Sequence, residues 1–128
     1  MQLPILRVVD SITELQPADA GCVAVSGSHG GVSSARYAAA ARPLLSIFND
    51  AGGGRDGAGL AALGVLEEQG LACCTVGHES ARIGDAQSTL SDGIISRLNA
   101  QAAALGIEAG QSCRDAIATI RTVSRRQA

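Results

Sequence analysis

The feature that most restricts the fold of this chain is a local plan that occurs three times along the sequence. Each time, a short run rich in Val, Leu, Ile or Cys is followed by a turn dense in glycine and polar residues, and then by a helical stretch. The apolar runs are residues 22–26, 44–48 and 71–76. Because a helix after each strand returns the chain to the start of the next strand, this alternation predicts a parallel sheet.

Helical stretches are predicted at residues 32–41, 57–69 and 85–105. The last of them has Asp85 as its N-cap and an apolar stripe at helical spacing, formed by Leu90, Ile94, Leu98, Ala102 and Leu105. Residues 5–9 are a candidate fourth strand, and residues 112–123 a final helix. We therefore expect a three-layer α/β fold with a mostly parallel sheet of three or four strands and flanking helices, similar to half of a Rossmann-like or flavodoxin-like fold.

The length of 128 residues fits one α/β domain, which we place at residues 1–123, followed by a basic tail, residues 124–128, that is expected to fray. Tyr37 and Phe48 are the aromatic residues of the chain, so its core must be built from Ala, Val, Leu and Ile. Alanine-rich stretches at residues 38–41 and 100–104 suit close helix packing between subunits. We expect a homo-oligomer, with two-fold symmetry.

The basic residues exclude several classes of protein. The chain has no lysine, so it cannot form a Schiff base or place a Walker-type lysine on a phosphate. Its ten basic residues are arginines spread along the sequence, and the net charge is -2. The sequence therefore lacks the basic patch that nucleic-acid binding requires.

The cysteines indicate a reducing compartment. Cys22, Cys73, Cys74 and Cys113 have no C-x-x-C spacing, and three of them lie among apolar residues. Such cysteines are typical of reduced thiols that act as small hydrophobic side chains. The sequence also has no secretory leader and no apolar run near the ~20 residues of a membrane span. We expect a soluble, cytoplasmic protein with no membrane partner.

Polar residues gather in the three helix-opening turns. Right-handed crossovers place these turns at one edge of the sheet, beyond the carboxyl ends of the strands, where open α/β sheets bind their ligands. The turns contain both histidines of the chain, two arginines and several carboxylates; the residues are Ser28, His29, Asn49, Asp50, Arg55, Asp56, His78, Glu79, Ser80, Arg82 and Asp85. We expect these side chains to converge on a small-molecule site.

Residues 26–30 read Ser-Gly-Ser-His-Gly at a predicted strand-to-helix turn. The stretch resembles the nucleophile elbow of the α/β-hydrolases, with Ser26 where that family usually has glycine. In that family the nucleophile, the acid and the histidine follow in this order, and Ser28, Asp50 and His78 end successive predicted strands in the same order. The resemblance implies that Ser28 attacks an acyl carbon, His78 carries the proton and Asp50 orients the imidazole.

Two other functions fit the same turns. A non-catalytic domain would bind a nucleotide or another small anion through the glycine-rich turns, with His29 and His78 as hydrogen-bond donors and Ser28 as a helix cap. A lyase or isomerase would use His78 with Asp50 or Glu79 for acid–base chemistry without a covalent intermediate.

Two cofactors are open alternatives to a site without any. Residues 52–57 match G-x-G-x-x-G between a strand and a helix, and Glu79 stands near the distance expected for a ribose-binding acid, so the segment resembles a dinucleotide-binding unit. A divalent metal would draw its ligands from three different turns, namely from His29, Asp50, Asp56 and His78. Neither pattern is complete, and we predict no cofactor.

The leading sequence-based hypothesis is a hydrolase that acts on an ester or amide bond of a small anionic molecule. Its catalytic residues would be Ser28, Asp50 and His78. Arg55 and Arg82 would hold the anionic group, because a guanidinium can pair with a carboxylate through two hydrogen bonds. The full set of predicted substrate-binding residues is His29, Gly30, Asn49, Arg55, Glu79 and Arg82, and the backbone N–H of His29 would also serve the oxyanion.

Overall fold

The computed structural model describes residues 4–126, and the side chains of all of these except residues 55, 56 and 121–126. Its centre is a single sheet of five strands in the order β1-β2-β3-β4-β5. Neighbouring strands from β1 to β4 are parallel, and β5 is antiparallel to β4. The strands are β1 (Leu6–Val9), β2 (Val23–His29), β3 (Leu45–Asn49), β4 (Ala72–Val76) and β5 (Ile95–Leu98).

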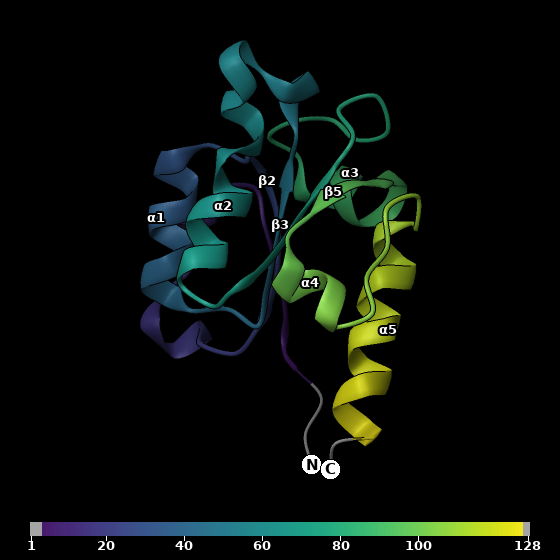
Figure 1. Ribbon diagram of the computed structural model, residues 1–128. Coiled ribbons are helices and arrows are strands. Elements are labelled where there is room, and N and C mark those ends of the chain that lie inside the picture. Colours follow the sequence, from purple (N-terminus) through teal and green to yellow (C-terminus); the bar gives the residue numbers. More distant parts are fainter. Residues whose placement is uncertain (1–3, 127–128) are drawn as a thin grey trace.

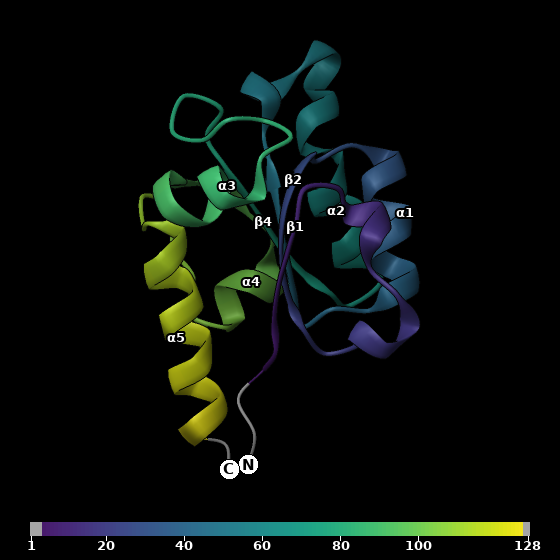
Figure 2. The same ribbon diagram turned by 180° about the vertical axis from the view of Figure 1, so that it is seen from behind.

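Helices cover both faces of the sheet, which confirms the predicted three-layer α/β fold (Figure 1). One face carries the helices α1 (Val32–Ala41) and α2 (Ala61–Glu68) with the short turns η1 (Ile12–Glu14) and η2 (Pro17–Asp19). The opposite face carries α3 (Ala86–Asp92), α4 (Ala100–Ala104) and α5 (Cys113–Arg126), as the view from behind also shows (Figure 2). Two further 3-10 turns, η3 (Ala51–Gly53) and η4 (Arg55–Leu60), precede α2.

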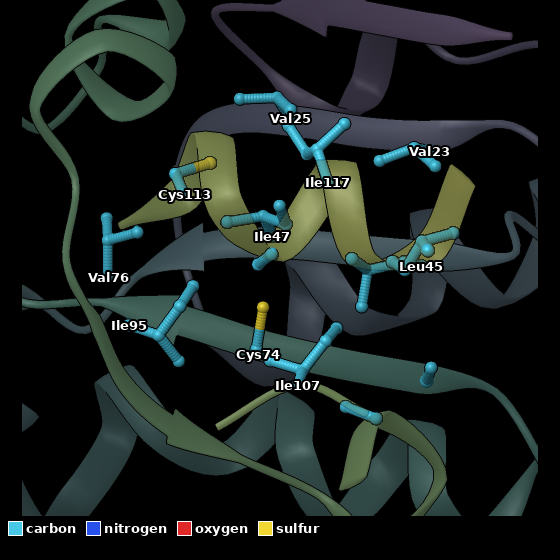
Figure 3. Close-up of a cluster of buried hydrophobic side chains, with 14 of the residues drawn as sticks. Val23, Val25, Leu45, Ile47, Cys74, Val76, Ile95, Ile107, Cys113 and Ile117 are labelled. Carbon is cyan, nitrogen blue, oxygen red and sulfur yellow. The ribbon is translucent and has the colours of Figure 1, made fainter. Parts of the chain in front are cut away.

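Small aliphatic side chains form a separate core on each face of the sheet. On the α5 face, Val25 and Ile47 from the strands meet Ile117 and Cys113 from α5 (Figure 3). On the α1 face, Ala35 and Ala38 are fully buried against the sheet, where Phe48 is the largest buried side chain. Alternate residues of one strand serve the two cores, because successive strand side chains point to opposite faces.

The long helix predicted at residues 85–105 is wrong, because the segment forms α3, β5 and α4. Gly93 is the C-cap of α3, and the β-branched Ile94 and Ile95 that follow favour an extended strand. Asn99 then caps α4, accepting the N–H of Ala102 at 3.0 Å. Leu90, Leu98, Ala102 and Leu105 of the predicted stripe still pack in the core of the α5 face, whereas Ile94 is 43% exposed. The fifth strand exceeds the three or four that we expected.

The final helix is longer than its pattern indicates. It runs to Arg126, and so includes part of the tail predicted at residues 124–128, of which residues 127 and 128 lie outside the described part. Within the described part of the chain, no helix combines the length and the apolar character that crossing a membrane requires.

Candidate functional site

The chain leaves the two neighbouring strands β3 and β4 toward opposite faces of the sheet (Figure 1). After β3 it passes through η3 and η4 to α2, and after β4 it passes through residues 77–85 to α3 on the other face. Open α/β sheets bind their ligands at the carboxyl ends of the strands, where these two loops begin. We refer to residues 49–54 and 77–82 as the β3–β4 edge.

Asp50 and His78 meet at the β3–β4 edge. Oδ1 of Asp50 accepts the backbone N–H of His78 at 3.0 Å and lies 3.5 Å from Nδ1 of the imidazole. The side chain of Asp50 is 14% exposed, whereas that of His78 is 52% exposed. The Asp50 carboxylate is therefore largely shielded from solvent, whereas the imidazole of His78 next to it is accessible to solvent.

Hydrogen bonds keep the Asp50 carboxyl ionised. Partial burial acts to raise its pKa, but hydrogen bonds from the backbone N–H of Gly52, the hydroxyl of Ser96 and the backbone N–H of His78, together with the nearby imidazole, outweigh that effect. The net result is a pKa below the ordinary value of 3.8. Asp50 is thus an anion near neutral pH, and it can orient the imidazole and stabilise its protonated form.

A glycine lets the loop after β3 lie against the imidazole. Gly52 has φ +71°, and a Cβ at this position would come 3.3 Å from Cε1 of His78. Its N–H also donates to Oδ1 of Asp50 at 2.8 Å. Gly52 therefore contacts both members of the pair, in a conformation that other residues adopt only with strain.

Asn49 links the two loops of the edge and does not face a ligand. Its side chain is fully buried, donates to the carbonyl oxygen of Ala81 at 3.1 Å and accepts the N–H of Ala51 at 2.8 Å. These hydrogen bonds give Asn49 a structural role, and its expected role in substrate binding stays a prediction.

Ser28 lies inside β2 and not on the predicted turn at residues 27–31. The register between β2 and β3 shifts between Val25 and His29, so the strand bulges at this point. The hydroxyl of Ser28 accepts the backbone N–H of Ile12 at 3.0 Å. A nucleophile elbow needs a strained turn; among the described residues the non-glycine positions with positive φ are Arg42 and Ala51.

Close packing explains the glycine beside Ser28. A Cβ on Gly27 would collide with the backbone of Gly84 and Asp85, which follows from the hydrogen bond of 2.7 Å between the N–H of Gly84 and the carbonyl oxygen of Gly27. Gly27, the first residue of the turn predicted at residues 27–31, thus lets the loop after β4 pack closely on β2.

The remaining predicted residues are spread around the edge. His29 is exposed, and its imidazole lies over Gly31, where a Cβ would come 2.6 Å from Nε2. Gly30 is buried and donates its N–H to the carbonyl oxygen of Asn49 at 3.0 Å. Glu79 and Arg82 are exposed in the loop after β4. Arg55 lies in η4, and its side chain is outside the described part.

The structure describes only part of the two cofactor patterns drawn from the sequence. Residues 52–57 fold into the 3-10 turns η3 and η4 between the strand and α2. Across the residues that the structure describes, no group of three or more His, Cys, Asp or Glu side chains is arranged to hold a metal ion. Asp56, one of the proposed metal ligands, is a residue whose side chain lies outside that part.

Ser96 and Thr75 are site residues that sequence reasoning missed. Ser96 lies in β5, its side chain contributes to lowering the pKa of Asp50, and its Oγ is 2.9 Å from Oγ1 of Thr75. The incorrect long helix placed Ser96 on a helix far from the edge. The signal that would have found β5 is the Asp92-Gly93 helix end followed by two isoleucines.

These features define a three-layer α/β protein with an Asp–His pair at the carboxyl edge of its sheet. Comparison of the chain with protein-family models, with curated proteins and with solved structures gave no match.

Proposed function

We propose that this chain is an acid–base enzyme that moves a proton on a small molecule at the β3–β4 edge. His78 acts as the base and then as the acid, and Asp50 orients it. The proposal rests on one observation: Oδ1 of Asp50 contacts both the backbone N–H and Nδ1 of His78, while the imidazole is half exposed. Of the three functions expected from the sequence, this geometry best supports the lyase or isomerase.

The arrangement of the pair assigns a role to each ring nitrogen. In the tautomer that we propose, the proton is on Nδ1, 3.5 Å from the carboxylate oxygen, and the lone pair of Nε2 is left for the substrate. The distance of 3.5 Å is long for a hydrogen bond, and such contacts in free enzymes often tighten when substrate binds.

The proposed reaction needs one base, which is Nε2 of His78. Nε2 of His78 takes a proton from a carbon next to a carbonyl or carboxylate group, and the electron pair of the broken C–H bond moves toward that group. In an isomerase the imidazolium returns the proton to another carbon. In a lyase the electron pair forms a double bond and expels a group from the neighbouring carbon, which the imidazolium protonates. Asp50 stabilises the imidazolium between the two steps.

Arg82 is our candidate for recognition of an anionic substrate. It lies in the same loop as His78, four positions along, and is exposed. Among the ion pairs between described residues, none involves Arg82. A free guanidinium beside a catalytic base can bind a substrate carboxylate and also stabilise the negative charge that develops during proton removal.

The assembly and location of the protein belong to the same proposal. All four cysteines are free and buried, as expected in a reducing cytoplasm. Val32 and Tyr37 of α1 are 45% and 51% exposed, so two large apolar side chains reach solvent on a helix face that also carries the exposed Ser33 and Arg36. A homo-oligomer would cover that face, and light scattering of the purified protein measures its mass.

Proton exchange in D2O tests the enzymatic proposal across a range of candidate substrates. A panel of small oxo acids, hydroxy acids and amino acids is incubated with the protein, and NMR follows deuterium entering carbon positions. We expect exchange with wild type and a loss of about 100- to 10,000-fold in His78→Gln, the usual contribution of a general base. Asp50→Asn should also be slow.

Glu68→Gln is the control, because Glu68 is exposed at the end of α2, just before β4 begins, whereas the β3–β4 edge lies where β4 ends. Exchange should persist in this variant at a rate close to wild type. The proposal is contradicted by a panel in which wild type exchanges no compound, or by a His78→Gln variant that keeps the wild-type rate.

A further inference from the structure

We infer that Asn49 is a positioning residue for the Asp50–His78 pair: its buried side-chain amide joins the loop that carries Asp50 to the loop that carries His78. The evidence is the two hydrogen bonds of this amide, one to each loop. The catalytic part of the inference rests on the proposed function. The structural part, that Asn49 holds the two loops together beside the pair, stands independently of it.

The Asn49 side chain bonds the backbone of both loops. Asn49 is the last residue of β3 and is 0% exposed. Its Oδ1 accepts the N–H of Ala51 at 2.8 Å, and its Nδ2 donates to the carbonyl oxygen of Ala81 at 3.1 Å. Ala51 directly follows Asp50, and Ala81 stands three positions after His78. One amide group therefore connects the two loops that carry the pair.

The partners of this side chain require an amide. A backbone N–H needs an acceptor and a carbonyl oxygen needs a donor, and the side chain of Asn supplies one of each. The same partners fix the orientation of the amide, because exchanging its oxygen and nitrogen would break both bonds. Since the site is buried, a substitution at Asn49 that removes either bond leaves a backbone group without a partner.

A closed turn connects Ala81 to His78. The carbonyl oxygen of Gly77 accepts the N–H of Ala81 at 3.2 Å, so residues 77–81 form one turn with His78 inside it. Gly77 directly follows β4, which fixes the first end of the turn to the sheet. The bond from Asn49 to Ala81 fixes the second end to β3. Asn49 thus acts on the imidazole through the turn that carries it.

A second buried asparagine offers a matched control. Asn99 directly follows β5 and is 8% exposed. Its Oδ1 accepts the N–H of Cys73 at 3.0 Å, and its Nδ2 donates to the carbonyl oxygen of Leu71 at 3.0 Å. These bonds lie at the start of β4, whereas His78 follows the end of that strand. A substitution of Asn99 therefore removes bonds of the same kind as those of Asn49, but away from the β3–β4 edge.

The test follows amide hydrogen exchange of the His78 backbone N–H by NMR, because Asp50 accepts this N–H at 3.0 Å. Asn49→Ser removes the Nδ2 donor, and its single hydroxyl on a shorter side chain cannot serve both loops. We expect the His78 amide to exchange about tenfold faster in Asn49→Ser, measured relative to the amide of the buried Ile47. Asn99→Ser should leave this ratio unchanged. No acceleration in Asn49→Ser, or an equal one in Asn99→Ser, overturns the inference.

A measurement on wild type covers the case in which Asn49→Ser does not fold. The two protons on Nδ2 of Asn49 should exchange slowly and show nuclear Overhauser contacts with Ala81, because they belong to a buried donor 3.1 Å from its acceptor. Exchange as fast as that of the side-chain amide of the exposed Gln69 would overturn the inference.

Kinetics separate the inference from the proposed function. Where wild type catalyses proton exchange on a substrate, a misplaced imidazole should lower kcat of Asn49→Ser by up to about 100-fold with KM little changed, while Asn99→Ser keeps the wild-type kcat. A higher KM alone, with the His78 amide unaffected, would overturn the inference and assign Asn49 to substrate binding. A faster His78 amide in Asn49→Ser, without catalysis by wild type, supports the positioning and contradicts only the proposed function.

Discussion

Asp50 and His78 are 28 residues apart in the sequence, yet one oxygen of Asp50 contacts both the backbone and the ring of His78. The register of the sheet explains the meeting. Asn49 at the end of β3 pairs with Val76 at the end of β4. Asp50 and Gly77, which follow these two residues, therefore leave the sheet side by side. The loop after β4 needs one further residue, Gly77, to bring the N–H of His78 to the carboxylate.

Asp50 should make the stability of the protein depend on pH. Its folded-state pKa is depressed, so its contribution is present above the pKa of the unfolded chain and is lost as the pH falls through the folded-state value. Asp50→Asn removes this contribution. We therefore expect the free energy of unfolding to decrease less between about pH 6 and pH 3 in the variant than in wild type. Urea unfolding at the two pH values measures the difference, and equal decreases would contradict the assignment.

Gly52 should be sensitive to substitution for two reasons that a control can separate. Gly52→Ala places an alanine at φ +71°, at a cost of about 1–2 kcal/mol, and also pushes a methyl group against the imidazole of His78. Gly53 has φ +90°, and a Cβ there would meet nothing within 4 Å. We expect both variants to lose stability in urea unfolding, but only Gly52→Ala to shift the NMR signals of the His78 ring. Equal shifts in both would show that the loop does not hold the ring.

The cysteines should be unreactive until the protein unfolds. Burial raises the pKa of the Cys113 thiol to about 12, and it raises the pKa of Cys73 and Cys74 as well. For Cys22, burial and the nearby Asp19 carboxylate both raise the thiol pKa. The thiolate is the reactive form of cysteine. A chromogenic disulfide reagent should therefore label the native protein slowly, whereas in denaturant it should react with four thiols per chain and release four equivalents of its chromophore. Fast labelling of the native protein would contradict the buried placement.

The sequence predicts the parallel half of this fold well, because that half follows from local patterns. Three strands and two helices are marked by apolar runs that glycine or proline ends, and crossover rules then bring the turns after β3 and β4 together. Those rules predict that Asp50 and His78 share one edge, as the structure shows. The spacing of Leu90, Leu98 and Leu105 is misleading, since residues from three short elements can share one core face.

What the sequence could not predict depends on backbone detail. Whether Ser28 ends a strand or opens a turn depends on the register shift in β2, where the N–H of Gly84 also bonds the carbonyl oxygen of Gly27. The position of Ser96 depends in the same way on one extra residue in β5. Neither bulge has a sequence signature, because strand pairing joins segments that are far apart in the chain.

Ser28 tests the hydrolase hypothesis against the acid–base proposal. Its hydroxyl accepts the N–H of the buried Ile12, so Ser28→Ala should leave that donor without an acceptor and cost about 1–3 kcal/mol of unfolding free energy. Ser33→Ala, at an exposed position of α1, is the control and should change stability by less than about 0.5 kcal/mol. Urea unfolding of the two variants distinguishes a structural hydroxyl from a dispensable one.

An aryl fluorophosphonate probe then asks whether the same hydroxyl is a nucleophile. A serine becomes reactive when a base removes its proton, and the described hydrogen bond of Ser28 is to a backbone N–H and not to His78. We expect intact-mass analysis to show no adduct on wild type. An adduct that disappears in both Ser28→Ala and His78→Ala would instead show that the pair activates Ser28, and the site would then be that of an acyl hydrolase. With no adduct and proton exchange that depends on His78, the imidazole acts on the substrate directly.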